Sequence, residues 1–383
     1  MDNRSSLSRL PSLDGWRALS ILMVIGFHMG FIAPASTKPF FNWMFDGFLG
    51  VRFFFIISGF LITWLMILEM DQTGQVSFKR FYMRRCLRIL PVYCAFLLVL
   101  GGFQLLTGFK ESGLTWFALL TFTRNYVEGT SSSGHLWSLS VEEQFYLIWP
   151  AVFLCVAKDA KQRIRKAACI LAIPVILAPV FRVLGYMASR DHTHLLSTSM
   201  LGIGKSYKGI IGQIFSDVSF FDRCDSLAFG CFCAILLADK YETFGNWIKK
   251  HSISVCFIAL GLILIPYIFG RSFIPAYIMI PFGNSFQAAG FSMLLMHSVI
   301  QPRWGAYQAL SWRWVRQIGI LSYSLYIWQQ IFWTRPWAAQ QIHNAAPEWW
   351  VWVWLIPTFV VAAVSYYGLE RPLLKLRSRF RGA

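Results

Sequence analysis

The sequence predicts an all-α polytopic membrane protein with about ten transmembrane helices. Hydrophobic residues make up 56% of the 383 positions and charged residues only 14%, whereas soluble domains carry about 25% charged residues. Long apolar stretches also recur along the chain, each near the roughly 20 residues that a helix needs to cross the hydrocarbon of a bilayer. Together these observations exclude an ordinary cytosolic enzyme and a disordered chain.

Ten segments have the length and the apolar content of a membrane span, some of them only if a charge is buried inside. The polar N-terminus leads into the first segment without a small-residue cleavage site, which favours a retained signal anchor. In chain order, we expect spans at residues 18–37, 46–68, 89–109, 137–157, 167–187, 224–238, 252–270, 272–302, 315–335 and 349–369.

The basic residues predict the orientation of these spans. Ten spans place both termini on one side of the membrane, and most of the 35 Lys and Arg residues fall in the connections on that same side. Because cytoplasmic loops of membrane proteins collect Lys and Arg, we expect both termini in the cytoplasm. The same rule explains the net charge of +17 without a nucleic-acid partner.

The chain is expected to form one membrane-embedded domain over residues 1–383, with its core at about 10–370 and no appended soluble domain. The longest polar connection, near 187–223, is too short for a second domain. The eight cysteines include no C-x-x-C pair and lie mostly in apolar runs. They indicate neither a metal site nor a disulfide framework.

The first candidate functional cluster lies in the first span. Arg17 and His28 are eleven positions apart, so on a helix they share a face and lie about 16 Å apart along the axis. Asp14 joins that face if the helix begins early enough. Snorkelling of Arg17 and a simple structural hydrogen bond of His28 are the alternative explanations. An uncharged imidazole in an apolar site is suited to act as a general base.

The second cluster lies at the outer end of the fourth predicted span, in HLWSLSVEEQFYLIWP. Glu142 shares a face with Ser138, four residues earlier, and lies at a depth comparable to His28. A carboxylate beside an imidazole fixes its tautomer and stabilises the imidazolium that forms on proton abstraction. Solvation at the membrane boundary is the alternative for Glu142 and Glu143.

The third cluster lies before the third span, where FKRFYMRRCLRILP contains Arg84, Arg85 and Arg88. Positive-inside anchoring alone explains them equally well, but guanidinium groups also bind phosphate oxygens in a bidentate way. A weaker fourth signal is SYSLYIWQQ, where Tyr326 and Gln329 share a helix face. Interfacial aromatic residues account for that signal without a function.

These blocks resemble the acyltransferase-3 family of bacterial membrane-bound O-acyltransferases. Six blocks occur in the family's order over roughly residues 10–370. They are LDGWRALSILMVIGFH, GFLGVRFFFIISGFLIT, RRCLRILP, HLWSLSVEEQFYLIWP, RCDSLAFG and SYSLYIW.

The resemblance implies a multi-pass enzyme of the bacterial inner membrane with no bound cofactor. It would transfer an acyl group, usually acetyl from acetyl-CoA, from cytoplasmic acyl-CoA to a hydroxyl of a glycan or glycolipid. The family's essential Arg and His correspond to Arg17 and His28. Its basic stretch corresponds to Arg84, Arg85 and Arg88. Its acidic motif corresponds to Trp137, Ser138 and Glu142.

The resulting hypothesis places the donor phosphates on the three arginines, with the pantetheine arm passing Arg17. His28 then acts as the base or accepts the acyl group, Glu142 orients its ring, and Asp14, Trp137, Ser138 and Tyr326 support the site. In one departure, Gln329 stands where many relatives have a histidine. In another, some relatives carry an additional C-terminal soluble domain.

Two other functions fit the sequence. A transporter or flippase for an anionic glycan precursor would use Arg52, Arg182 and the buried carboxylates as a substrate path without chemistry, although no internal repeat is visible. A catalytically inactive acyl-carrier or sensory subunit would fit Gln329. The acceptor and the acyl chain length are left open by the sequence.

Overall fold

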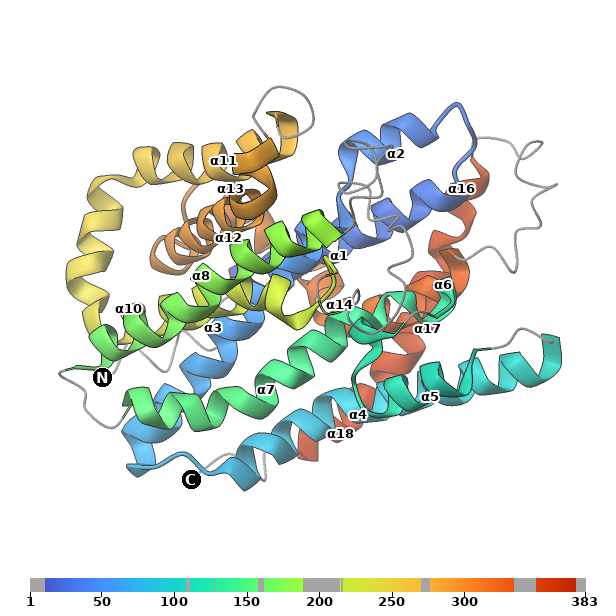
Figure 1. Ribbon diagram of the computed structural model, residues 1–383, viewed down its shortest axis with the longest axis horizontal. Coiled ribbons are helices and arrows are strands. Elements are labelled where there is room, and N and C mark those ends of the chain that lie inside the picture. The colour runs from blue at the N-terminus through green and yellow to red at the C-terminus, as the bar shows by residue number, and fades with distance from the viewer. Residues whose placement is uncertain are drawn as a thin grey trace.

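The computed structural model describes residues 11–107, 111–127, 129–157, 162–188, 214, 216–269, 276–333 and 349–376. Within these ranges the regular secondary structure is entirely helical, with no strand (Figure 1). The predicted all-α class is therefore confirmed. Part of the long connection between α8 and α10, including residues 189–213, lies outside the described residues.

The first half of the chain contains most of the helices that surround the candidate site described below. The β-region residue Asp46 starts α3 by accepting a hydrogen bond from the Leu49 amide at 3.0 Å, and Gly74 ends it with a φ of 74°. The elements are α1 (Pro11–Ile32), α2 (Lys38–Met44), α3 (Gly47–Thr73), α4 (Phe78–Thr107), α5 (Gly113–Leu120), η2 (Arg124–Tyr126), α6 (Ser131–Gly134) and α7 (Leu136–Ala157).

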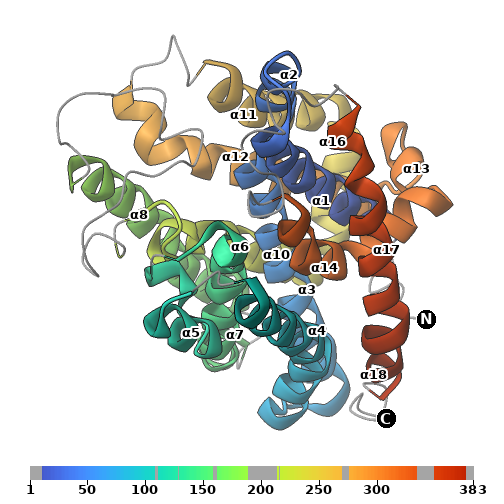
Figure 2. The ribbon, with the colours of Figure 1, turned by 90° about the vertical axis from the view of Figure 1, so that its right-hand side faces the viewer.

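The second half closes the bundle. Figure 2 shows α16, α17 and α18 following one another along one side of the molecule, next to α14. The elements are α8 (Arg163–Ala188), α10 (Phe220–Lys250), α11 (Ser252–Phe269), α12 (Ala276–Ile300), α13 (Ala306–Leu310), α14 (Arg313–Trp333), α16 (Trp350–Val353), α17 (Leu355–Ser365), the π-helical turn η3 (Tyr366–Glu370) and α18 (Arg371–Leu376).

The number of membrane spans differs from the prediction. Each of the ten predicted ranges overlaps a helix of the described chain, but six helical segments of that chain are long and apolar enough to cross a membrane. The count becomes seven if α10 and α11, which meet at an 87° bend, form one broken span. Buried polar side chains such as Gln287 on α12 and Gln329 on α14 lower the apolar content of those helices. Ten spans are thus not confirmed, and the cytoplasmic termini stay a prediction.

Helix α3 lies at the centre of the packing, against both α1 and α10. It meets α10 at a pair of glycines, where a Cβ on Gly230 would lie 2.1 Å from the Ile56 carbonyl oxygen, and one on Gly59 would lie 2.2 Å from that of Leu227. Small residues let helix backbones approach closely inside membranes. This close crossing fixes the orientation of α3, and therefore the directions in which its side chains point.

Replacing Gly230 with alanine is expected to destabilise the protein by about 1–3 kcal/mol, because the methyl group forces two backbones apart. Thermal unfolding of the purified protein in detergent measures this effect. Gly102→Ala on α4 is the matched control, since a Cβ there meets nothing within 4 Å. If both variants unfold at the wild-type temperature, the α3–α10 crossing is not close-packed.

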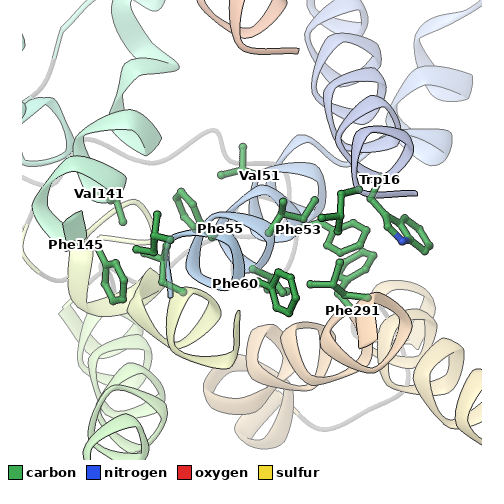
Figure 3. Close-up of a cluster of buried hydrophobic side chains, with 14 of the residues drawn as sticks. Trp16, Val51, Phe53, Phe55, Phe60, Val141, Phe145 and Phe291 are labelled. Atoms are coloured by element: carbon green, nitrogen blue, oxygen red, sulfur yellow. The ribbon is translucent and has the colours of Figure 1, made fainter. Parts of the chain in front are cut away.

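A cluster of aromatic side chains fills the space between α1, α3 and α12 (Figure 3). Phe53 stacks on Phe291 with ring centroids 4.3 Å apart, and Trp16 meets Phe53 edge-on at 4.9 Å. The buried Trp16 indole donates to the Ser298 hydroxyl at 2.9 Å, so its polar atom is satisfied. This core holds the start of α1 and the middle of α3 in fixed register beside the candidate site.

Candidate active site

A cavity of about 680 Å³ lies between α1, α3, α4, α7 and α14, within the usual size range of ligand sites. Gln72 and Thr73, at the end of α3, line it and are exposed, so the cavity opens to the surface there. Most of the residues predicted from sequence line it. They are Asp14, Arg17, Arg84, Arg85, Arg88, Ser138, Glu142 and Tyr326.

Three of the cavity arginines carry charges that no carboxylate neutralises at close range. Within the described ranges, Arg17, Arg85 and Arg88 form no ion pair. The Arg85 guanidinium lies 4.6 Å from the centre of the Tyr146 ring, a cation–π contact. Arg17 and Arg88 are close enough to interact electrostatically. Like charges facing one cavity favour an anionic ligand.

Arg84, by contrast, already has a partner. Its guanidinium is 2.7 Å from a carboxylate oxygen of Glu69, and the two side chains are 11% and 7% exposed. Glu69 also accepts a hydrogen bond from the Ser77 amide at 3.1 Å, with Arg80 at 3.9 Å. This pair joins the end of α3 to the start of α4. Arg84 thus bridges two helices at the rim of the cavity, and its role as a phosphate ligand stays a prediction.

Replacing Arg84 with glutamine is expected to cost about 3 kcal/mol of stability, because Glu69 then keeps a buried charge without its close partner. Thermal unfolding measures the loss. The double variant Glu69→Gln/Arg84→Gln should recover most of it, since neither charge is left behind. An Arg84→Gln protein as stable as wild type would show that the pair is not buried in the working protein.

The carboxylates of the cavity face its arginines. Glu142 accepts a hydrogen bond from the Ser58 hydroxyl at 2.6 Å, and its electrostatic neighbours are Arg85, Arg88 and Arg17. Asp14 lies among Arg17, Arg88 and a further arginine on α14. Both acidic side chains thus belong to the basic cavity. The predicted contact between Glu142 and the His28 ring is not formed, because Ser58 and the arginines hold the carboxylate elsewhere.

Two buried hydroxyls face the same cavity. The Tyr326 hydroxyl donates to the carbonyl oxygen of His135 at 2.6 Å and is also hydrogen-bonded to the Ser138 hydroxyl. His135 itself is 4% exposed, and its Nε2 lies 3.1 Å from the Ile327 carbonyl oxygen. These contacts tie α14 to the start of α7, so the hydroxyl positions are fixed.

His28 lies near the cavity but is not among the residues that line it. The ring is half-buried between Phe27 and Phe31, with centroids 5.4 and 5.5 Å away. The Val24 carbonyl and the Gln329 side chain are its polar neighbours, and its Nδ1 is buried without a hydrogen-bond partner. Gln329 is three residues after Tyr326, so His28 lies about one helical turn past the cavity wall.

Trp137 also lies outside the cavity lining. Its ring is 5.9 Å from that of Phe48 and 6.2 Å from that of Phe55, and the Arg223 guanidinium lies 5.6 Å from its centre. Trp137 therefore packs between α3, α7 and α10. It lies behind the residues that face the cavity, so any support that it gives to the site acts through packing.

Sequence reasoning missed Ser58 and Glu69, which contact the predicted residues directly. Ser58 lies in the apolar run FFFIISGF, and a lone serine in such a run carries little signal. Glu69 is near the end of α3, where a carboxylate is expected to be solvated. Only the chain's packing shows that each faces an arginine-lined cavity.

Comparison with known sequences defines the class of protein to which this site belongs. Residues 10–368 match the acyltransferase-3 family, described as an acyltransferase domain. The chain belongs to this family, which confirms the resemblance seen in its sequence blocks. It is a multi-pass membrane protein of an acyltransferase family.

Individual relatives extend the comparison. The chain is 25% identical to the peptidoglycan O-acetyltransferase OatA of Listeria monocytogenes, over 97% of this chain and 57% of the relative. It is 26% identical to a putative peptidoglycan O-acetyltransferase, YrhL, of Bacillus subtilis, over 95% and 55% respectively. A putative O-acetyltransferase of Staphylococcus aureus is 31% identical over 51% of this chain and 34% of its own length. The chain spans little more than half the length of the first two relatives. No solved structure matches it.

Proposed function

We propose that this protein is an O-acetyltransferase that moves an acetyl group from acetyl-CoA to a hydroxyl of a cell-surface glycan. The observation that carries the proposal is a cavity, within an acyltransferase domain, lined by Arg17, Arg85 and Arg88 without carboxylate partners. Guanidinium groups bind phosphate oxygens strongly, and coenzyme A is an acyl carrier rich in phosphate. Acetyl-CoA, or another acyl-CoA, is therefore the donor, a substrate and not a resident cofactor.

The geometry suits a long donor. Its phosphates would lie among the arginines, and the cavity opens beside Thr73 and Arg84, at the basic connection that the positive-inside rule assigns to the cytoplasm. The pantetheine arm would run along α1 from Arg17 towards His28, about 16 Å further along the helix. The thioester would pass the Ser138–Tyr326 hydroxyl pair before reaching His28.

His28 is the proposed general base. It takes the proton from the acceptor hydroxyl while that oxygen attacks the thioester carbonyl carbon; the new C–O bond forms, the C–S bond breaks, and the thiolate leaves with the proton from the imidazolium. In the covalent variant His28 first accepts the acetyl group and then passes it on. Gln329 orients the ring. Glu142 acts in the donor cavity, where it holds Ser58 and faces the arginines.

A peptidoglycan acceptor is the favoured case within this proposal. Two relatives that align over nearly the whole chain are named as peptidoglycan O-acetyltransferases, one of them putative. The bacterial cytoplasmic (inner) membrane is the location such a reaction requires, with the donor on one side and the glycan on the other. Other glycans and glycolipids are the acceptors to test beside it.

The transporter alternative loses the residues that suggested it. Arg182 is paired with Asp222 at 3.0 Å and with Asp225 at 2.7 Å, and the Ser285 hydroxyl lies 2.8 Å from it. Arg52 is hydrogen-bonded to Gln287 and, at 2.6 Å, to Asn284. Both arginines thus join helices to one another, and neither lines the cavity. A substrate path through them has no support in the packing.

The test is donor turnover by the purified protein in detergent, with acetyl-CoA and soluble peptidoglycan fragments. We expect free thiol release that requires both substrates, together with an acetyl ester on the glycan detected by mass spectrometry. Thiol release with a different glycan fraction would change only the acceptor. A folded protein that releases no thiol with any glycan fraction would refute the proposed function.

A further inference from the structure

A fifth arginine lines the donor cavity, in addition to Arg17, Arg84, Arg85 and Arg88. Arg316 belongs to the first turns of α14, whereas Arg85 and Arg88 come from α4 and Arg17 from α1. The sequence gives it no motif, because it lies at the very start of the predicted span 315–335, where an anchoring basic residue is expected. Its position in the cavity results from the packing of α14.

The packing of α14 on α1 sets the direction of this side chain. A Cβ on Gly319 would lie 1.8 Å from the Asp14 carbonyl oxygen, so the two helices are in backbone contact there. Arg316 is three residues before Gly319 and therefore shares its face of α14. The guanidinium is directed at the start of α1, beside Asp14.

The charge of Arg316 is not neutralised by a partner of its own. Within the described part of the chain it forms no ion pair, and its buried Nε has no hydrogen-bond partner. The nearby carboxylate, Asp14, is shared electrostatically with Arg17 and Arg88. Glu142 also lines the cavity, and Glu69 is paired with Arg84. Five arginines therefore face three carboxylates there, and the cavity keeps an excess of positive charge. An anion with several phosphate oxygens would supply the missing partners.

We infer that Arg316 binds a phosphate group of the coenzyme A donor and completes a four-arginine site with Arg17, Arg85 and Arg88. The inference rests on the proposed function and adds a donor-binding residue that the sequence motifs do not contain. Either the pyrophosphate or the 3′-phosphate could occupy the position, since both present the same oxygens. A donor without phosphates would gain nothing from Arg316.

The experiment compares acetyl-CoA, acetyl-3′-dephospho-CoA and S-acetylpantetheine as donors, with saturating soluble peptidoglycan fragments. The proteins are wild type, Arg316→Gln, Arg316→Lys and the matched control Arg313→Gln, three residues earlier on the same helix, exposed and outside the cavity lining. Losing a hydrogen bond to a charged group is expected to raise the KM for acetyl-CoA about 10-fold or more in Arg316→Gln. Arg316→Lys should lie in between, and Arg313→Gln should match wild type.

The phosphate-free donor separates binding from structure. The KM for S-acetylpantetheine should be the same in wild type and Arg316→Gln; an equal rise for both donors would mean a structural role and overturn the inference. If the penalty disappears with the dephospho donor, Arg316 contacts the 3′-phosphate; if it persists, Arg316 contacts the pyrophosphate. Wild-type turnover with an unchanged Arg316→Gln KM refutes this inference alone. No wild-type turnover of acetyl-CoA refutes the proposed function and the inference together.

Discussion

Replacing His28 with alanine is expected to lower the rate of acetyl transfer by about 10²–10⁴-fold, the usual contribution of a positioned general base. The polar neighbours of the imidazole are the Val24 carbonyl and the Gln329 side chain, and no charged group is left unpaired by its removal. The fold should therefore survive, and the KM for acetyl-CoA should change little because His28 does not line the donor cavity. Initial rates of thiol release, with thermal unfolding alongside, measure both effects.

His251→Asn is the matched control for this experiment. His251 lies at the bend between α10 and α11, where its ring packs on Trp247 at 5.1 Å, and it is not part of the cavity. Its replacement should leave the rate at the wild-type level. Full activity in His28→Ala would exclude His28 from the chemistry, whereas loss of folding in that variant would call for His28→Gln as the test.

Replacing Arg88 with glutamine is the second large effect expected, and it should appear in donor binding. Arg88 faces the cavity without an ion pair, so the change removes a proposed phosphate ligand, together with a positive charge close to Glu142 and Glu370. The KM for acetyl-CoA should rise about 10–100-fold, the worth of a charge-assisted hydrogen bond or two. Some stability should be lost as well, because these two carboxylates lose a nearby positive charge. Arg85→Gln should behave similarly, with some loss of stability from its contact with Tyr146.

Arg84 and Lys79 make this prediction discriminating. Arg84→Gln should mainly reduce stability, because its partner is Glu69, while Lys79→Gln at an exposed position of the same segment should change neither quantity. Equal KM effects at Lys79, Arg84 and Arg88 would indicate a diffuse electrostatic attraction instead of a built site. A normal donor KM in Arg85→Gln and Arg88→Gln would place the phosphates elsewhere.

The helical class followed from composition because the scarcity of charge and the length of the apolar runs are properties of the chain itself. The number of spans could not be predicted in the same way, because hydropathy cannot distinguish a lipid-facing helix from one that buries polar groups. Gln287 and Gln329 are 6% and 0% exposed, and both lie on predicted spans. Their burial depends on neighbouring helices that no local window contains.

The motifs of the candidate site could be predicted from the sequence, but the contacts between them could not. The basic motif on α4 and the acidic motif on α7 were found from sequence, and the structure places them in one cavity with Arg17. Similar depth in the membrane did not bring Glu142 to His28, because depth fixes position along a helix axis and not the direction around it. The Ser58–Glu142 contact and the place of Arg316 depend on packing between distant segments.

The central claim is that the protein transfers an acetyl group from a donor on one side of the membrane to a glycan on the other. Supplying the two substrates on opposite sides of a membrane tests this claim most directly. Wild-type protein is reconstituted in sealed vesicles, with ¹³C-acetyl-CoA on the side of the α3–α4 connection and soluble peptidoglycan fragments only on the other side. The account predicts ¹³C-acetyl ester on the separated glycan, carried across through Arg17 and His28, and none with His28→Ala. Labelled glycan that forms only when donor and acceptor share one compartment, or no label at all, would contradict it.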